Sequence, residues 1–340
     1  MTSAADRYAR AGVNLAVADS LKVKIGELVE STRGPQVLSN RGGFGGLFDV
    51  AALPEKNPVL VASTDGVGTK LKLAVAVGRY RGVGHDIVNH CVNDILVCGA
   101  RPLFFLDYLG FGRLDPVVAP EVVAGIAEAC RVAGCALLGG ETAEMPGVYS
   151  EGDFDLVGTI VGVVARESIL DGRRVRPGQT LLGLPSSGLH TNGYSLARRI
   201  VAEAGLSLDE PIAGDARPLA EILLAPHRSY LGELRPLLQE HRVCALAHIT
   251  GGGFEGNVSR VLPSGVGVDI DAASWTPPPI FALLARLGGV SQAEMHRVFN
   301  MGVGMVVIVE ESEAARCLAA LPGSRVIGHT NADGGVRVRF

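Results

Sequence analysis

Three carboxylates in the first half of this 340-residue chain lie in settings that suit a magnesium–nucleotide complex. Asp65, Asp94 and Glu141 each occur near glycines, at an expected strand end or on the polar face of an expected helix. Backbone N–H groups of glycines can approach a phosphate closely. A hard cation that bridges phosphates takes a few carboxylates together with waters. These settings therefore indicate an ATP–Mg²⁺ site with the three carboxylates as metal ligands.

The stretch from Ser63 to Lys70 reads Ser-Thr-Asp-Gly-Val-Gly-Thr-Lys and follows an apolar run, residues 58–62, that predicts a buried strand. Ligands commonly bind at strand ends in open α/β sheets. An Asp-Gly pair after a strand is also typical of an ordinary turn, and the residues alone leave this alternative open. Lys70 either contacts a phosphate or simply begins the helix expected from residue 71. The predicted ATP contacts in this stretch are Thr64, Asp65, Gly66 and Lys70.

Residues 84–99 predict a helix with one apolar and one polar face. Asp86, His90 and Asp94 follow one another at four-residue spacing, and Asn93 shares their face. Short acidic and amide side chains are poor helix formers, but they are good contacts for metals and ligands. We expect Asn93 and Asp94 to contact the nucleotide.

Residues 41–49 read Arg-Gly-Gly-Phe-Gly-Gly-Leu-Phe-Asp, which favours neither a helix nor a strand. The stretch is either a flexible surface loop or a flap whose N–H groups close over phosphates. As a flap it would cover the triphosphate of ATP and exclude water. The predicted ATP contacts in the flap are Gly42, Gly43, Phe44, Gly45 and Gly46.

The second half has no comparable acidic set, and its glycine-bearing turns suit a phosphorylated polar substrate. Residues 186–195, Ser-Ser-Gly-Leu-His-Thr-Asn-Gly-Tyr-Ser, lead into an expected helix, which is a favourable place for an anion. Residues 250–254, Thr-Gly-Gly-Gly-Phe, follow an expected strand and open another helix. The candidate substrate contacts are Ser187, His190, Thr191, Asn192, Thr250, Gly251, Gly252 and Gly253.

The histidines allow more than one function. His190 either accepts a proton from the substrate or only donates a hydrogen bond to it. His248 precedes the glycine turn and either contacts the substrate or braces that turn. We expect His85 and His227 to be structural or on the surface.

Strands and helices alternate along the chain, which predicts a mixed α/β protein with two domains, residues 1–168 and 169–340. Hydrophobic residues make up 47% and charged residues 19%, so the chain can bury a sizeable core. The net charge of −4 and the absence of a basic run give no reason to expect nucleic acid as a partner. No Walker A or Gly-x-Gly-x-x-Gly motif opens the first half, so ATP would bind in another way.

The six cysteines include no Cys-x-x-Cys pair, which indicates buried, reduced thiols. No apolar run approaches the length needed to cross a bilayer, and the first residues carry no apolar signal core. We therefore expect a cytoplasmic protein without a membrane partner.

Several stretches resemble the phosphoribosylformylglycinamidine cyclo-ligase family, also called aminoimidazole ribonucleotide synthetases. The matching stretches are residues 8–13, 63–70, 91–94, 99–108, 139–147, 186–195, 250–254 and 299–305. The resemblance implies a homodimer whose N-terminal domains join their strands into one β-barrel. It also implies ATP-dependent cyclisation of formylglycinamidine ribonucleotide to 5-aminoimidazole ribonucleotide, with release of ADP and phosphate, in purine synthesis. The implied catalytic residues are Asp65, Asp94, Glu141, Lys70 and His190.

The chain departs from this family at one place and leaves two alternatives. The family commonly has Ala-Met where this chain has Asn89-His90, so His90 is either a local hydrogen-bonding substitution or a change in the metal environment. One alternative is a related ATP-dependent synthetase or kinase of the same architecture, although thiamine-phosphate kinase lacks the loop at residues 190–194 in the form found in this chain. The other is a nucleotide-binding homologue without catalysis, against which all three carboxylates and both glycine turns argue.

Overall fold

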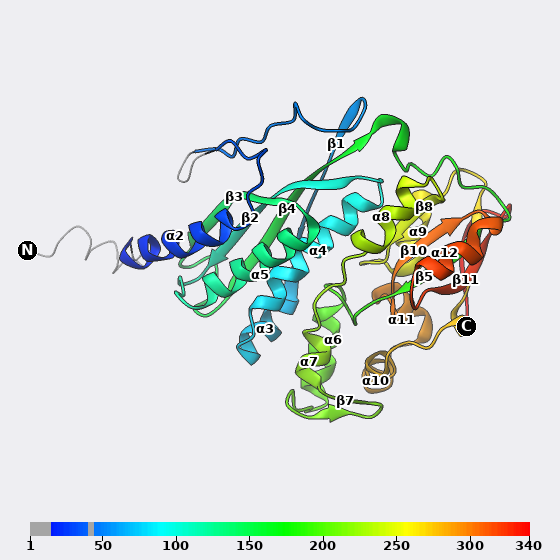
Figure 1. The fold of residues 1–340 in the computed structure, drawn as a ribbon. Coiled ribbons are helices and arrows are strands. Elements are labelled where there is room, and N and C mark those ends of the chain that lie inside the picture. The colour runs from blue at the N-terminus through cyan, green and yellow to red at the C-terminus, as the bar shows by residue number, and fades with distance from the viewer. Residues whose placement is uncertain (1–14, 40–43) are drawn as a thin grey trace, which may run out of the picture. The chain divides into compact units, whose positions relative to one another are not determined.

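The computed structural model of the chain describes residues 15–39 and 44–340, which form two compact units (Figure 1). The first unit comprises the described residues up to Ile95 together with Arg101–Val163. The second comprises Leu96–Ala100 and Val164–Phe340. This division falls a few residues before the boundary expected after residue 168.

The first unit is built on a four-stranded sheet with the strand order β1-β4-β2-β3. Its strands are β1 (Pro58–Gly66), β2 (Arg101–Phe111), β3 (Ala136–Glu144) and β4 (Phe154–Ala165). Its helices are α2 (Leu15–Glu30), α3 (Leu71–Val77), α4 (Arg81–Leu96) and α5 (Val118–Ala133), with α4 and α5 along one face of the sheet (Figure 1). Strand β2 pairs antiparallel with β4 and parallel with β3, and α5 provides the crossover between β2 and β3.

Close approach of backbones fixes α4 against the sheet and against α5. A Cβ atom at Gly158 of β4 would lie 2.7 Å from Cγ1 of Ile87, and one at Gly162 would lie 2.5 Å from Cδ1 of Ile95. A Cβ atom at Gly84 would lie 2.3 Å from the carbonyl oxygen of Val122 in α5. Only glycine allows these contacts, so α4 presents its residues to β1 from a rigid position.

The apolar stripe predicted for residues 84–99 is confirmed, since Ile87, Val88, Cys91 and Ile95 are fully buried. Helix α5 begins at Val118, after a turn that Asp115 holds. The carboxylate of Asp115 accepts hydrogen bonds from the backbone N–H groups of residues 117 and 118 at 2.7 and 3.0 Å. The apolar stripe could be predicted from the sequence because its residues are neighbours within one helix.

Strands β1 and β3 run further than their apolar segments predicted. Asp65 and Gly66 belong to β1, and Glu141 belongs to β3, so these residues lie within strands and not in turns that follow them. The interpretation of Asp65-Gly66 as an ordinary turn is wrong. Pairing with β4 continues past the apolar run, as the hydrogen bond from Val67 N–H to the carbonyl of Leu156 shows at 3.0 Å.

The second unit contains a six-stranded sheet with the order β12-β9-β11-β5-β10-β8. Its strands are β5 (Thr180–Pro185), β8 (Val243–His248), β9 (Gly267–Asp271), β10 (Val303–Val309), β11 (Arg325–Asn331) and β12 (Gly335–Arg339). Strand β10 is fully buried and lies antiparallel between β5 and β8, whose ends carry the two predicted substrate turns.

Helices and one small hairpin complete this unit. The helices are α6 (Tyr194–Glu203), α7 (Leu219–Leu223), α8 (Leu231–Gln239), α9 (Gly253–Val258), α10 (Pro279–Gly288), α11 (Gln292–Val298) and α12 (Ala314–Ala320). The hairpin of β6 (Pro211–Ile212) and β7 (Asp215–Pro218) is a feature that the sequence did not predict. No helix in the described residues is long and apolar enough to cross a membrane.

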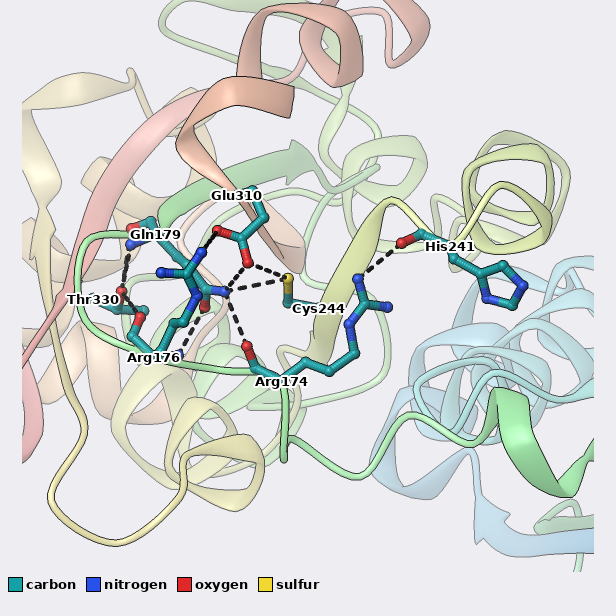
Figure 2. A network of polar contacts seen from close by, with 7 residues as sticks. All are labelled: Arg174, Arg176, Gln179, His241, Cys244, Glu310 and Thr330. Carbon is teal, nitrogen blue, oxygen red and sulfur yellow. Dashed lines mark hydrogen bonds and ion pairs between the residues drawn. The ribbon is translucent and has the colours of Figure 1, made fainter.

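The polar segment before β5 is fixed to the second unit by a network of side chains (Figure 2). The buried amide of Gln179 donates to the carbonyl oxygen of Arg174 at 3.0 Å, to Sγ of Cys244 at 3.3 Å and to a carboxylate oxygen of Glu310 at 2.9 Å. Arg176 pairs with the other oxygen of Glu310 at 2.6 Å. This segment is therefore part of the fold of the second unit and not a loose linker.

Candidate active site

The polar face of α4 meets β1 in a small acidic cluster formed by Asp65, His90 and Asp94. The Nε2 atom of His90 lies 3.0 Å from Oδ2 of Asp65 and 3.8 Å from Oδ2 of Asp94. The hydroxyl of Ser63 donates to the same oxygen of Asp94 at 3.0 Å. The side chain of Asp65 is 44% exposed, whereas that of His90 is 5% exposed. The carboxylates are thus open to solvent and the imidazole lies beneath them.

Charges in this cluster determine how its groups ionise. Burial acts to raise the pKa of Asp65, but the hydrogen bond and charge of His90 outweigh it and hold this pKa below its usual value. Burial acts to lower the pKa of His90, but the hydrogen bond to Asp65 and the charges of Asp94 and Asp65 raise it. Two carboxylates against one imidazole leave an excess of negative charge, which a cation would neutralise.

Lys70 lies outside this cluster and is fully buried. Its ammonium group is 2.8 Å from a carboxylate oxygen of Asp86, and both side chains are completely inaccessible to solvent. Burial lowers the pKa of Lys70, and the charge of Asp86 opposes that change. The short 3₁₀ turn Gly68–Lys70 leads directly into α3. The placement therefore favours the structural alternative over a phosphate contact, because an ammonium group paired in the interior does not reach a ligand.

Glu141 does not join Asp65 and Asp94 within one chain. It pairs with Tyr108 of β2, and both β2 and β4 lie between its strand and β1. Three inter-strand spacings of about 4.8 Å separate the backbones of Asp65 and Glu141 by roughly 14 Å. The structure thus brings two of the three predicted metal ligands together and leaves the third on the opposite edge of the sheet.

Asp107 is a further acidic residue beside Glu141. Burial raises the pKa of Asp107 to about 7, and the charge of Glu141 adds to the rise. It lies opposite Gly140 of β3, where a Cβ atom would come 2.3 Å from its Oδ1. A carboxylate inside an otherwise apolar strand is a sequence signal that could have identified this residue, although Asp107 was not predicted as a site residue.

The predicted flap is described in part. Gly42 and Gly43 lie outside the described residues, while Phe44 is fully exposed. A Cβ atom at Gly45 would have no neighbour within 4 Å among the described residues, whereas one at Gly46 would lie 2.4 Å from Cγ of Leu138. The end of this segment therefore lies against β3.

Two other predicted nucleotide contacts have different settings. The hydroxyls of Thr64 and Thr159 form a hydrogen bond of 2.8 Å, and Asn93 is fully buried.

In the second unit, His190 has a backbone φ of +63° and its side chain is buried. Its Nε2 atom accepts a hydrogen bond from the backbone N–H of Ser187 at 3.2 Å. Because that lone pair is occupied, a neutral ring carries its proton on Nδ1. This tautomer acts as a hydrogen-bond donor at Nδ1, which favours the second of the two functions predicted for His190.

His227 connects the residues around His190 to the end of β8. Its ring stacks on that of His190 with centroids 3.9 Å apart. Its Nε2 lies 3.0 Å from Nε2 of His248, and its Nδ1 lies 3.3 Å from the hydroxyl of Thr191. We expected His227 to be either structural or on the surface. It is buried, so the surface alternative is wrong. Nothing in its sequence neighbourhood indicated this position.

The two predicted substrate turns lie side by side. A Cβ atom at Gly251 would lie 3.2 Å from Oδ1 of Asn192, and the buried Nδ2 of Asn192 has no hydrogen-bond partner among the described residues. Gly253 has a φ of +61°, and a Cβ atom there would lie 1.8 Å from the carbonyl of His296, so only glycine fits.

Asn300, which was not predicted as a site residue, supports the first of these turns. Its amide donates to the carbonyl of Gly188 at 2.9 Å, and its side-chain oxygen accepts from the N–H of Gly302 at 2.9 Å. Ser186 donates to the same oxygen at 3.2 Å. A single asparagine therefore fixes residues 186–188 to the start of β10.

Comparison with known proteins matches both units. The family described as "AIR synthase related protein, N-terminal domain" matches residues 48–164, and "AIR synthase related protein, C-terminal domain" matches residues 176–340. The phosphoribosylformylglycinamidine cyclo-ligase of Myxococcus xanthus is 51% identical over 320 residues, which cover 94% of this chain and 93% of that protein. That of Bacillus mycoides is 46% identical over 337 residues, covering 98% and 97%.

Solved structures share the fold at lower identity. The hydrogenase maturation protein HypE of E. coli is 21% identical, with a TM-score of 0.65 and coverage of 92% of both chains. Thiamine-monophosphate kinase from Stenotrophomonas maltophilia is 20% identical, with a TM-score of 0.66 and coverage of 95% and 96%. These likenesses establish a common mixed α/β fold.

Proposed function

The chain belongs to the AIR synthase related protein family, and we propose that it is a phosphoribosylformylglycinamidine cyclo-ligase of purine synthesis. It would use ATP to convert formylglycinamidine ribonucleotide into 5-aminoimidazole ribonucleotide, ADP and phosphate. The observation that carries this proposal is identity of 46–51% to enzymes of that name over more than nine tenths of the chain. A kinase is not favoured, because identity to the Stenotrophomonas maltophilia kinase is only 20%. A non-catalytic homologue is not favoured, because the high identity is to proteins named as enzymes.

The proposed reaction has two steps. The formyl oxygen is phosphorylated by ATP, which releases ADP. The ribosyl-bearing nitrogen then attacks the formyl carbon and forms the C–N bond. Phosphate leaves with the former formyl oxygen, and the nitrogen loses a proton. Ring closure is intramolecular, so holding the substrate folded contributes much of the rate. Phosphoryl transfer likewise depends mainly on positioning and on neutralising charge.

Asp65 and Asp94 suit a divalent cation, since both carboxylates are partly exposed, lie near the same imidazole and are in excess over it. Mg²⁺ bound there would neutralise phosphate charge on ATP. Residues 44–46, at the described end of the flap, are candidates for covering the triphosphate. Lys70 is not included among the phosphate contacts, because it is buried and paired with Asp86.

In the second unit, the turns at residues 186–195 and 250–253 would hold the ribonucleotide. Asn192 offers a buried amide N–H₂ group at the contact of the two turns. Under the tautomer set by Ser187, His190 would donate a hydrogen bond to the substrate. His227 would hold both His190 and Thr191 in place.

We also propose that the protein is a homodimer in the cytoplasm, formed by the sheets of two first units. Strands β1 and β3 are the outer strands of this sheet, so each has one edge available for another strand. Several large apolar side chains in this unit are exposed, and a partner would cover them: Leu38, Leu47, Val50, Leu60 and Val148. Pairing β3 of one copy with β1 of the other would close a barrel. It would bring Glu141 of the first copy to Asp65 and Asp94 of the second.

The direct test is an activity assay with purified protein. The protein would be incubated with ATP, Mg²⁺ and formylglycinamidine ribonucleotide, and the product detected as a diazotisable aminoimidazole. Formation of this product together with one ADP per ring supports the proposal. A folded dimer that forms no aminoimidazole would overturn it, and ADP formed without aminoimidazole would indicate a kinase instead.

A further inference from the structure

Ring closure releases a proton from the attacking nitrogen, and the geometry of His190 does not suit its acceptance. The Nε2 lone pair of His190 accepts a hydrogen bond from the backbone N–H of Ser187 at 3.2 Å, so a neutral ring carries its proton on Nδ1. A Cβ atom at Gly304 of β10 would lie 2.4 Å from Cε1 of His190, so the ring is packed closely against that strand. His190 is therefore held as a hydrogen-bond donor, and the proton needs another acceptor.

Thr191, His227 and His248 form a chain of hydrogen bonds beside His190. Oγ1 of Thr191 lies 3.3 Å from Nδ1 of His227, and Nε2 of His227 lies 3.0 Å from Nε2 of His248. Both of these rings are buried, and the ring of His227 stacks on that of His190 with centroids 3.9 Å apart. The chain begins in the substrate turn at residues 186–195 and ends at the last residue of β8, two positions before the other substrate turn.

Each link of this chain holds one proton, so the chain has two possible directions. In the first, the hydroxyl of Thr191 donates to Nδ1 of His227, and Nε2–H of His227 donates to Nε2 of His248. The Thr191 oxygen then acts as an acceptor toward the substrate. In the second, Nε2–H of His248 donates to His227, and Nδ1–H of His227 donates to Thr191. One proton that enters at Thr191 converts the first direction into the second.

We propose that Thr191, His227 and His248 form a proton relay that removes the proton released in ring closure. The inference rests on the proposed function, which supplies that proton. Thr191 is the member that contacts the substrate, and the two histidines act through it. The distance of 3.3 Å between Thr191 and His227 is long, but hydrogen bonds of catalytic groups commonly tighten when the substrate binds.

The proton balance of the relay is complete within these three side chains. The attacking nitrogen gives its proton to Oγ1 of Thr191 while the hydroxyl proton of Thr191 moves to Nδ1 of His227. The Nε2 proton of His227 moves to Nε2 of His248, which becomes an imidazolium ion hydrogen-bonded to the neutral ring of His227. A hydrogen bond with one charged partner is stronger than a neutral one, and more so in a buried site, which stabilises this product.

Replacing His227 by glutamine separates a relay from a scaffold. The carboxamide of His227→Gln has a donor end and an acceptor end for Thr191 and His248, but it is neither an acid nor a base at neutral pH and does not pass a proton on. A single turnover, with enzyme in excess over formylglycinamidine ribonucleotide, would be followed by rapid quench for ADP and for aminoimidazole. We expect ADP at the unsubstituted rate and aminoimidazole slower on the order of a hundredfold, as for loss of a positioned proton acceptor.

Thr191 provides a second pair of variants. Thr191→Val keeps the shape of the side chain but removes the hydroxyl, so it should also form ADP faster than aminoimidazole. Thr191→Ser restores a hydroxyl and should recover most of the rate of ring closure that Thr191→Val loses. His329→Gln is the control for the histidine substitution, since His329 is an exposed residue of β11 outside both substrate turns, and both rates should stay unchanged.

The outcomes separate this inference from the proposed function. Ring closure at the unsubstituted rate in His227→Gln or Thr191→Val would overturn the relay, and so would equal slowing of ADP and aminoimidazole, which indicates a purely structural effect. If His227→Gln does not fold, the two Thr191 variants decide the question. In each of these cases the unsubstituted protein still forms aminoimidazole. A folded unsubstituted protein that forms none would overturn the proposed function, and the relay with it.

Discussion

The buried ion pair between Lys70 and Asp86 allows a structural function of Lys70 to be distinguished from a phosphate contact. Both side chains are completely buried, and the ammonium group lies 2.8 Å from the carboxylate. Lys70→Met would leave the carboxylate of Asp86 buried without its cation. Removing one partner of a buried pair typically costs about 3–5 kcal/mol of unfolding free energy. We expect a fall of this size in the stability of the first unit.

Urea unfolding would measure this loss at a fixed protein concentration. A loss of about 3 kcal/mol and a urea dependence of about 2–3 kcal/mol per molar predict a midpoint lower by roughly 1 M or more. The double variant Lys70→Met/Asp86→Leu removes both charges and should recover most of the stability, because an apolar pair of similar volume is often as stable as the ion pair. Activity at a temperature where all variants are folded should recover in the double variant as well.

A phosphate contact predicts the opposite pattern. Lys70→Met would then keep the urea midpoint and raise the KM for ATP, and the double variant would not restore it. This result would refute the conclusion that Lys70 is structural. Lys72→Met is the matched control, since Lys72 pairs with Asp153 at the surface and its loss should shift the midpoint little.

Three further predictions concern single side chains. Asp65→Asn should keep the urea midpoint and lower kcat by at least about a hundredfold, since it removes charge beside ATP; steady-state kinetics checks this. His227→Phe keeps a stacked ring but loses the contacts to Thr191 and His248. The KM for the ribonucleotide should therefore rise roughly tenfold, which corresponds to the loss of about one hydrogen bond. The KM for ATP is the internal control and should not change. The pKa of Asp107, about 7 in the folded protein, lies above its unfolded value of about 3.9. The folded protein therefore binds more protons between these values, and stability is lost as pH rises through 7; Asp107→Asn should abolish that loss in urea unfolding measured from pH 5 to 8.

Local sequence signals were sufficient to predict individual helices and strands, but not the order of the strands in the sheet. The apolar stripe of α4 was predicted because it depends on residues a few positions apart. The separation of Glu141 from Asp65 depends on two strands inserted between β3 and β1, and one of them, β4, comes later in the chain than both. Nothing near either carboxylate encodes that insertion.

Side-chain partners were the other limit of the sequence. Lys70 and Asp86 are sixteen residues apart and meet only because α4 packs on the sheet. His227 meets His190 and His248 because the second sheet brings the ends of β5 and β8 beside β10. Residue type indicates that a lysine or histidine can bind a ligand, whereas packing decides whether it is already engaged within the protein.

The strand order has one consequence that a mixing experiment can test. If β3 of one copy pairs with β1 of the other, each site combines Asp65 of one chain with Glu141 of the second. Asp65→Asn and Glu141→Gln homodimers would both be inactive. Their heterodimer would contain one site with both substitutions and one site with neither.

Equal amounts of the two variants, unfolded together and refolded, give heterodimers as about half of all dimers. One intact site in each heterodimer then restores roughly a quarter of the unsubstituted activity. Asp65→Asn mixed with itself is the control and should stay inactive. Activity that remains absent after heterodimers are confirmed by differential tagging would mean that Glu141 does not act across the interface. A single chain holds Asp65 on one outer strand, with Asp94 of α4 near it, and Glu141 on the other outer strand, so shared sites are the arrangement in which the predicted acidic set can act together.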